Sequence, residues 1–110
     1  MSCFGCPLHC KKRHVVKSGR YACDGGYGLE YETLDAYGGR IGNSDVEAVI
    51  YANQLTNRLG MDTDNVGGVI GFMMELYEKG VIDEKFTEGL ELRWGDQDLL
   101  VKLIKLIAYR

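Results

Sequence analysis

The sequence is poor in features that would place it in several common classes of protein. Its 110 residues include one proline and one tryptophan, and no run of about 18 apolar residues that could cross a bilayer. The first apolar stretch is interrupted by cysteines and then by Lys11, Lys12 and Arg13, which is not the pattern of a signal peptide. Membrane-spanning and secreted proteins are therefore disfavoured, and we expect a cytoplasmic chain with no membrane partner.

Acidic residues are missing from the start of the chain. Residues 1–20 contain five of the 13 lysines and arginines and none of the 16 acidic residues, so the remainder of the chain is acidic. A basic segment of this kind could bind nucleic acid, or it could offset the negative charge of a thiolate-ligated cluster. Because the acidic remainder argues against a broad nucleic-acid surface, we expect no nucleic-acid partner.

Cysteine is scarce, yet three of the four cysteines lie close together. Cys3, Cys6 and Cys10 follow the spacing C-x2-C-x3-C. In a cytoplasmic chain, clustered cysteines are more typical of metal ligands or redox thiols than of disulfides. Thiolates at this spacing can bind three corners of a [4Fe–4S] cluster, and Gly5 and Pro7 suit the tight turn that such binding needs. The pattern favours an iron–sulfur site that lacks its fourth ligand.

Two other interpretations of the cysteines stay open from spacing alone. A zinc site could combine the three clustered thiolates with His9 or His14, or with Cys23 as a fourth thiolate. The cysteines could also be free thiols in a flexible terminus. Cys23 lies in the glycine-rich stretch YACDGG and could equally be buried and inert.

The rest of the chain carries helical patterns. Residues 1–29 are expected to form an irregular cysteine loop and a glycine-rich connector, and residues 30–110 a helical domain. Apolar spacing and capping signals predict helices over residues 30–37, from a capping box at Ser44 to Gly60, over about 64–79, and from Asp96 to the last residue. We therefore predict a mainly α fold, with three to four helices forming a small orthogonal or bundle-like domain behind the irregular N-terminal loop.

Glycine is unusually frequent inside the third predicted helix. Gly67, Gly68 and Gly71 each cost roughly 1 kcal/mol of helix stability against alanine. Close approach of another backbone or of a ligand is the usual reason for such glycines. In a chain of this size we expect this glycine face to be exposed and to favour self-association.

Several short stretches occur together in an order that resembles a known family. They are CFGCPLHC at residues 3–10, GLEYETL at 28–34, NRLGMDT at 57–63, MELYEKG at 74–80, GLELRWGD at 89–96 and the final IAYR. In this order they resemble the tungsten-containing aldehyde:ferredoxin oxidoreductases. Family members are several times longer, and this chain is similar to their middle, helical domain. The resemblance implies that domains on both sides of it are absent.

The resemblance implies a role for the clustered cysteines. In the family, the first three ligands of a [4Fe–4S] cluster come from this loop, and they match Cys3, Cys6 and Cys10. The fourth ligand comes from far downstream, so it is expected beyond Arg110. The implied electron acceptor is ferredoxin or an electron-transfer subunit, and the intact protein is expected to be a homo-oligomer.

The resemblance also implies a cofactor-binding motif and a candidate catalytic residue. The family's pterin-binding pattern D-x-x-G-L-D matches residues 57–62, where Asn57, Gly60, Met61 and Asp62 stand at the patterned positions. Asp62 would accept hydrogen bonds from the pterin, and it is also a natural N-cap for the third helix. The family places a glutamate beside the tungsten, and Glu32 matches it better than Glu30 does.

The implied activity is the oxidation of aldehydes to carboxylic acids at a tungsten or molybdenum bis-pterin. An alternative is a relative that reduces an aromatic acyl-CoA thioester, so the implied substrate is a small aldehyde or acyl compound. A non-enzymatic zinc-binding or interaction module is the alternative outside this class. The isolated 110-residue chain is expected to be inactive, because it lacks most of the implied cofactor site.

Overall fold

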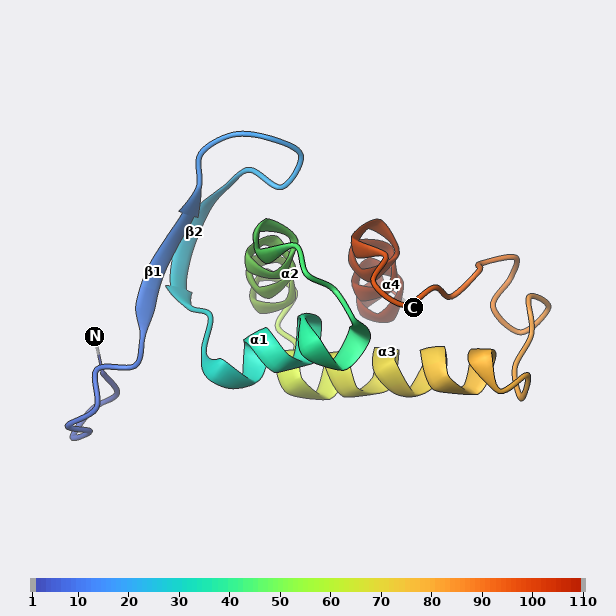
Figure 1. The fold of residues 1–110 in the computed structure, drawn as a ribbon. Helices are drawn as coiled ribbons and strands as arrows, with labels where there is room; N and C mark the ends of the chain where they lie inside the picture. The colour runs from blue at the N-terminus through green and yellow to red at the C-terminus, as the bar shows by residue number, and fades with distance from the viewer. Residues whose placement is uncertain (1, 110) are drawn as a thin grey trace.

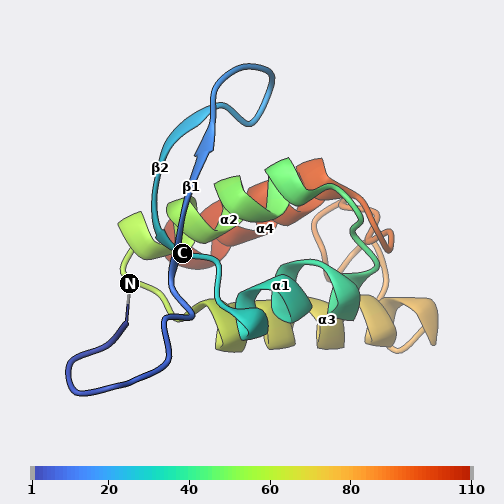
Figure 2. The same ribbon diagram turned by 60° about the vertical axis from the view of Figure 1, so that its left-hand side comes forward.

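The computed structural model describes residues 2–109, and it leaves aside the side-chain surroundings of residues 25, 27 and 28. The elements in chain order are strands β1 (Lys12–Val16) and β2 (Cys23–Gly28), helix α1 (Tyr31–Tyr37), a 3-10 turn η1 (Gly39–Ile41), and helices α2 (Val46–Arg58), α3 (Thr63–Glu78) and α4 (Gln97–Tyr109). Figures 1 and 2 show α2 and α4 side by side in one layer and α1 and α3 in a second layer that runs crosswise to it. The predicted mainly α, orthogonal arrangement of helices is confirmed.

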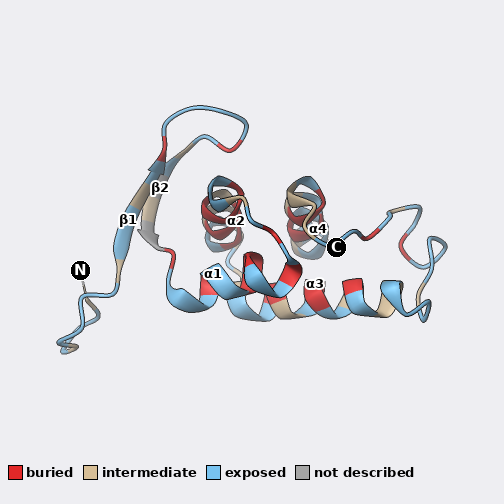
Figure 3. Ribbon diagram, viewed as in Figure 1, coloured by how far each residue is buried: buried red, intermediate tan, exposed pale blue. Residues whose placement is uncertain are grey.

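The apolar stripes of the helices meet between these two layers. Figure 3 shows the buried residues on the facing sides of the helices. The largest side chains with the least exposure include one from α1, one from η1, two from α3 and two from α4, namely Tyr37, Ile41, Ile70, Met74, Leu100 and Ile104. α2 adds the smaller Val49 and Ile50 to the same core, so each of the four helices contributes apolar surface that it could not bury alone.

Aspartates begin three of the four helices. Asp45 caps α2, and its Oδ1 accepts from the N–H groups of Glu47 at 3.0 Å and Ala48 at 3.3 Å. The prediction that Ser44 is this cap is therefore wrong by one residue. The side chain of Asn43 explains the shift, because its oxygen accepts from the Asp45 N–H at 3.0 Å and fixes the entry to the helix. Carboxylates at helix N-termini satisfy free N–H groups and complement the helix dipole.

The glycines of α3 make room for α1 and for the turn that follows it. A Cβ on Gly67 would lie 2.7 Å from the Cβ and the carbonyl oxygen of Ala36, so the two helix backbones touch at this point. Gly68 and Gly71 lie beneath the side chain of Arg40. The expected close approach of another backbone is confirmed. The expected exposure of the glycine face is wrong, and self-association loses the support of that face.

The N-terminal region contains a β-hairpin where irregular structure was expected. β1 and β2 pair antiparallel, with Lys12 opposite Gly28 and an irregularity between His14 and Val16. The loop between the strands is tied to the start of α4, because the Tyr21 hydroxyl donates to Asp98 at 2.6 Å. β2 reads CDGGYG, a composition with weak strand propensity, and this explains why no strand is predicted there.

The remaining N-terminal residues, 2–11, form neither helix nor strand, and we call them the 2–11 loop. In the part of the chain that the structure describes, no helix is long and apolar enough to cross a membrane.

Candidate functional site

The 2–11 loop carries the three clustered cysteines at the surface. Cys3 and Cys10 are exposed and Cys6 is half-buried, and all three are free thiols. The Cys6 N–H donates to the Cys3 carbonyl at 3.1 Å, and Gly5 adopts a φ of 72°, a left-handed conformation that glycine accepts readily. The tight turn expected between the first two cysteines is therefore present.

The structure does not gather these sulfurs into a formed metal site. Over residues 2–109, no three side chains of His, Cys, Asp or Glu lie close enough to hold a metal ion. This applies to the three-cysteine set and equally to the zinc sets that add a histidine or Cys23. In donor chemistry the loop fits a cluster, because it offers three accessible thiols at suitable spacing, followed directly by the exposed cations Lys12 and Arg13.

The other two candidate ligands lie on the hairpin. Cys23 is half-buried on β2 opposite Val16 and packs against the hydrophobic core. His14 lies on β1, and its Nε2 is buried without a hydrogen-bond partner. The packing of Cys23 corresponds to the interpretation of this thiol as a structural residue.

The second candidate region is the turn that joins α2 to α3, residues 57–62, which we call the 57–62 turn. It closes α2 with a Schellman motif: the Met61 N–H donates to the Thr56 carbonyl and the Gly60 N–H to the Asn57 carbonyl, both at 3.1 Å. Gly60 has a φ of 71°, as this motif requires. Among the described residues, no atom beyond Gly60 and its chain neighbours lies within 4 Å of the position that a Gly60 Cβ would take, so the backbone there is open to a ligand.

The side chains of the 57–62 turn divide into two kinds. Asp62 is exposed at the N-cap of α3, where its Oδ2 accepts from the Asn65 N–H at 3.2 Å. Asn57 is exposed, and its amide donates to the Asn53 side chain at 3.3 Å. Met61 instead packs against the core. The turn therefore presents an aspartate, an asparagine and bare backbone to the surface, while Met61 anchors it from below.

The candidate catalytic residue Glu32 lies in the first turn of α1 and is exposed. Its neighbour Thr33 is buried, and the Thr33 Oγ1 lies 3.3 Å from the Oγ1 of Thr63, the residue after Asp62. Figure 2 shows the first turns of α1 and α3 at the same end of the molecule. Glu30 sits at the N-cap of α1 but makes no capping bond through its side chain. The helix that carries Glu32, α1, thus contacts the residue that directly follows the 57–62 turn.

A second hydroxyl pair joins α1 to α2, at the other end of the 57–62 turn. The Tyr37 hydroxyl lies 2.6 Å from the Thr56 Oγ1, and both side chains have no exposed surface. Burial raises the pKa of Tyr37 to about 12, and the negative charge of Asp62 acts in the same direction. Sequence reasoning missed these hydroxyl residues, because partners 19 and 30 residues apart leave no local pattern.

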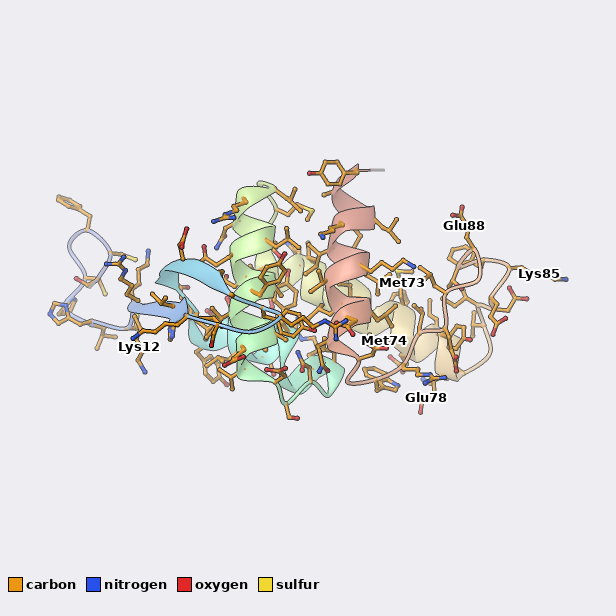
Figure 4. The ribbon with its side chains drawn as sticks, turned by 90° about the horizontal axis from the view of Figure 1, so that it is seen from above. Lys12, Met73, Met74, Glu78, Lys85 and Glu88 are labelled. Carbon is orange, nitrogen blue, oxygen red and sulfur yellow. The ribbon has the colours of Figure 1, made fainter. Side chains whose placement is uncertain are left out.

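A half-open groove of about 460 Å³ lies elsewhere, between the end of α3, the loop after it and α4. Its apolar lining includes Met73, Phe86, Leu90, Leu106 and Ile107. Figure 4 shows the labelled loop residues Lys85 and Glu88 at the opposite end of the molecule from Lys12. None of the candidate site residues lines this groove.

Comparison with known proteins identifies relatives of this chain. The family model described as "Aldehyde ferredoxin oxidoreductase, domains 2 & 3" matches residues 1–110. A tungsten-containing aldehyde ferredoxin oxidoreductase of Pyrococcus furiosus is 36% identical over 109 residues, which cover 98% of this chain and 17% of the relative. The corresponding protein of Thermococcus kodakarensis is 34% identical with the same coverage.

A third relative has another name. It is an "Aliphatic sulfonate oxidoreductase, WOR-like subunit" of Pyrococcus furiosus, 34% identical over 96% of this chain and 17% of its own length. Together the matches define a segment of a redox enzyme family, and the sequence resemblance is confirmed. The chain belongs to the aldehyde ferredoxin oxidoreductase family and spans about a sixth of the length of the curated relatives it matches.

Proposed function

We propose that this chain is the part of a tungsten-pterin oxidoreductase that supplies three cluster ligands and one pterin-binding turn. The enzyme would oxidise aldehydes to carboxylic acids and pass the electrons through a [4Fe–4S] cluster to ferredoxin or a partner subunit. The observation that carries this proposal is the family match over all 110 residues. The names of the tungsten-containing relatives support the metal, and molybdenum is the alternative.

In this proposal the 2–11 loop is the electron-transfer part. Cys3, Cys6 and Cys10 would each bind one iron, and a residue from another part of a longer protein would supply the fourth ligand. The exposure of the loop supports this division, because a ligand from elsewhere can reach sulfurs that this chain does not cover. Lys12 and Arg13 would offset the charge of the thiolates.

The 57–62 turn is the part of the chain that would bind a pterin. The Asp62 carboxylate would accept hydrogen bonds from the amino and ring N–H groups of a pterin, and the Asn57 amide oxygen would add a neutral acceptor. Gly60 leaves the backbone open to close approach. The metal bound by the pterins would supply the two-electron redox chemistry.

Glu32 would take part in proton transfer. Oxidation of an aldehyde to an acid takes its second oxygen from water and releases two electrons and two protons. An exposed carboxylate at the start of α1 can orient that water or accept one of the protons. The position of Glu32 next to the Thr33–Thr63 contact supports this role, because it brings its helix to the cofactor turn.

A second candidate function concerns the substrate. The relative named for aliphatic sulfonate is 34% identical to this chain, and one named for aldehyde is 36% identical. Values this close favour neither substrate, so an oxidoreductase of another small compound, such as a sulfonate or an aromatic acyl-CoA thioester, is the alternative. The word "subunit" in that relative's name supports a partner subunit as electron acceptor.

The test of the cofactor part is a substitution of Asp62. In a protein of the relatives' length that carries this segment, Asp62→Ala should remove most of the bound pterin, measured by fluorescence of the oxidised cofactor after extraction. Asp64→Ala is the matched control, because Asp64 is exposed in the first turn of the same helix and lies outside the motif. Full pterin content in Asp62→Ala would refute the assignment of the motif.

A further inference from the structure

Two hydroxyl contacts tie α1 to the segment that contains the 57–62 turn. One contact, Thr33 with Thr63, lies directly after the turn, and the other, Tyr37 with Thr56, lies directly before it. The two α1 residues are one helical turn apart, so both point from the same face of α1. The 57–62 turn is therefore held at both of its ends by one short helix.

The direction of the buried hydrogen bond can be worked out from its partners. The Thr56 hydroxyl donates to the Ala52 carbonyl at 2.7 Å, as expected for a threonine inside a helix. A hydroxyl has one hydrogen, so Tyr37 must donate to Thr56. The backbone carbonyl of Thr56 accepts the Met61 N–H that closes the turn. Thr56 thus connects the α1 contact and the closing bond of the turn.

Among the described residues α1 has few other directional restraints, and one of them lies at its end, where Asn43 Nδ2 donates to the Tyr37 carbonyl at 3.1 Å. It has seven residues and no side-chain cap at Glu30. A helix this short is not stable by itself, so its position depends on tertiary contacts. The contact of Ala36 with Gly67 sets how closely α1 approaches α3, but an apolar contact is not directional. The hydroxyl contacts are directional, and they fix how α1 is rotated and shifted against the turn.

We propose that Thr33 and Tyr37 are positioning residues that hold Glu32 in register with the 57–62 turn. The inference rests on the proposed function for the roles of Glu32 and Asp62. Proton transfer requires a carboxylate placed within a fraction of an ångström, and such placement needs supporting residues with directional bonds. Neither positioning residue touches substrate in this scheme, and each acts through the backbone of α1.

The first test uses the 110-residue chain and amide hydrogen exchange. Tyr37→Phe should speed exchange of the Met61 amide about tenfold, since one buried hydrogen bond is lost and Thr56 keeps its carbonyl partner. Thr33→Val should speed exchange at the start of α3. The α4 amides, for example that of Leu103, should keep their rates. Equal acceleration throughout the chain, or none, would overturn the proposal.

The matched control is Thr87→Val. Thr87 is also buried, and its hydroxyl donates to the Leu90 carbonyl at 2.6 Å, in the loop at the far end of the molecule from the hairpin (Figure 4). Its removal should leave exchange in the 57–62 turn unchanged. Acceleration of Met61 exchange by this control would show that any lost hydroxyl loosens the turn, and it would overturn the specific role of Tyr37.

The second test separates positioning from stability in a protein of the relatives' length. Thr33→Val should lower kcat about tenfold with KM and pterin content unchanged, and Thr33→Ser should restore kcat, because serine keeps the hydroxyl. Loss of pterin in parallel with kcat, or failure of serine to restore it, would overturn the proposal. Failure of the proposed function is distinguishable, because it would appear as full pterin content in Asp62→Ala while the exchange result is unaffected.

Discussion

The 2–11 loop and the helical body of the protein are built on different principles. The loop has neither helix nor strand and exposes its large apolar side chains, with Phe4 and Leu8 among the most exposed residues. The helical body buries apolar residues from all four helices and adds hydroxyl contacts between them. The comparison teaches that the proposed cluster ligands depend on sequence spacing alone, whereas the proposed cofactor turn depends on tertiary contacts within this chain.

The largest contrast is expected from side-chain truncation. Ile104→Ala, in the fully buried part of α4, should lower the free energy of unfolding by about 2–5 kcal/mol, because it leaves a cavity between the helix layers. Leu8→Ala in the loop, where the side chain is 70% exposed, should change it by less than about 0.5 kcal/mol. Urea unfolding followed by circular dichroism measures both. A similar loss for Leu8→Ala would mean that the loop packs on the body.

The next effect concerns the contact between α1 and α3. Gly67→Ala should destabilise the protein by about 1–3 kcal/mol, because the new methyl group would lie 2.7 Å from Ala36. Gly68→Ala is the matched control: its nearest neighbour is 3.5 Å away, so it should be neutral or stabilising by up to about 1 kcal/mol. Thermal unfolding of both variants checks the difference. If the two variants behave alike, α1 does not pack on α3 as described.

A third effect is a loss of stability at high pH, caused by one tyrosine in the helical body and one in the loop of the hairpin. Burial, together with the hydrogen bond to Asp98, raises the pKa of Tyr21 to about 12, and burial raises the pKa of Tyr37 to about 12. Both tyrosines ionise near pH 10 in the unfolded chain. The unfolded state therefore releases protons first, so the contribution of these two tyrosines to stability should be constant below about pH 10 and fall between about pH 10 and 12.

The Tyr37→Phe variant checks this assignment. It should be less stable at neutral pH, but its stability should fall less steeply between about pH 10 and 12, because one of the two buried ionisations is gone. Urea unfolding at several pH values gives both quantities. An unchanged slope in Tyr37→Phe would contradict the assignment of the pH dependence to this side chain.

The smallest effect is expected from the cysteines themselves. Cys6→Ser should change the free energy of unfolding of the metal-free chain by less than about 0.5 kcal/mol, because Cys6 belongs to no packed cluster. Cys23→Ser should cost more, because Cys23 packs against the core. Equal and large losses for both would show that the loop thiols are structural.

The two regions also differ in how far the sequence predicts them. The helices follow from apolar spacing and from aspartates that can cap their first turns, and Gly60 and Met61 mark the Schellman motif that ends α2. The sequence does not distinguish Ser44 from Asp45 as the cap, because both residues are good caps, and only the tertiary position of Asn43 decides between them.

The hairpin and the hydroxyl contacts could not be predicted in the same way. β1 is mostly exposed and β2 is rich in glycine, so neither strand shows the alternation that identifies a half-buried strand. Thr33 and Tyr37 look like ordinary residues of a short helix, and their partners become visible only after the helices pack. The cysteine spacing can be recognised in the consecutive residues themselves. The stretch at 57–62 is recognised only through its resemblance to a family pattern, because the local pattern alone indicates an N-cap at Asp62.

The central claim, that the 2–11 loop provides three ligands of an iron–sulfur cluster, is tested most directly by anaerobic reconstitution with iron and sulfide. The protein used should have the relatives' length, so that it also supplies a fourth ligand. The account predicts about four irons per cluster and an EPR signal in the reduced state. Both should be lost when Cys3, Cys6 and Cys10 are all replaced by serine, and both should be kept in Cys23→Ser. Stoichiometric zinc with no iron uptake, or a cluster that survives without the three loop cysteines, would contradict it.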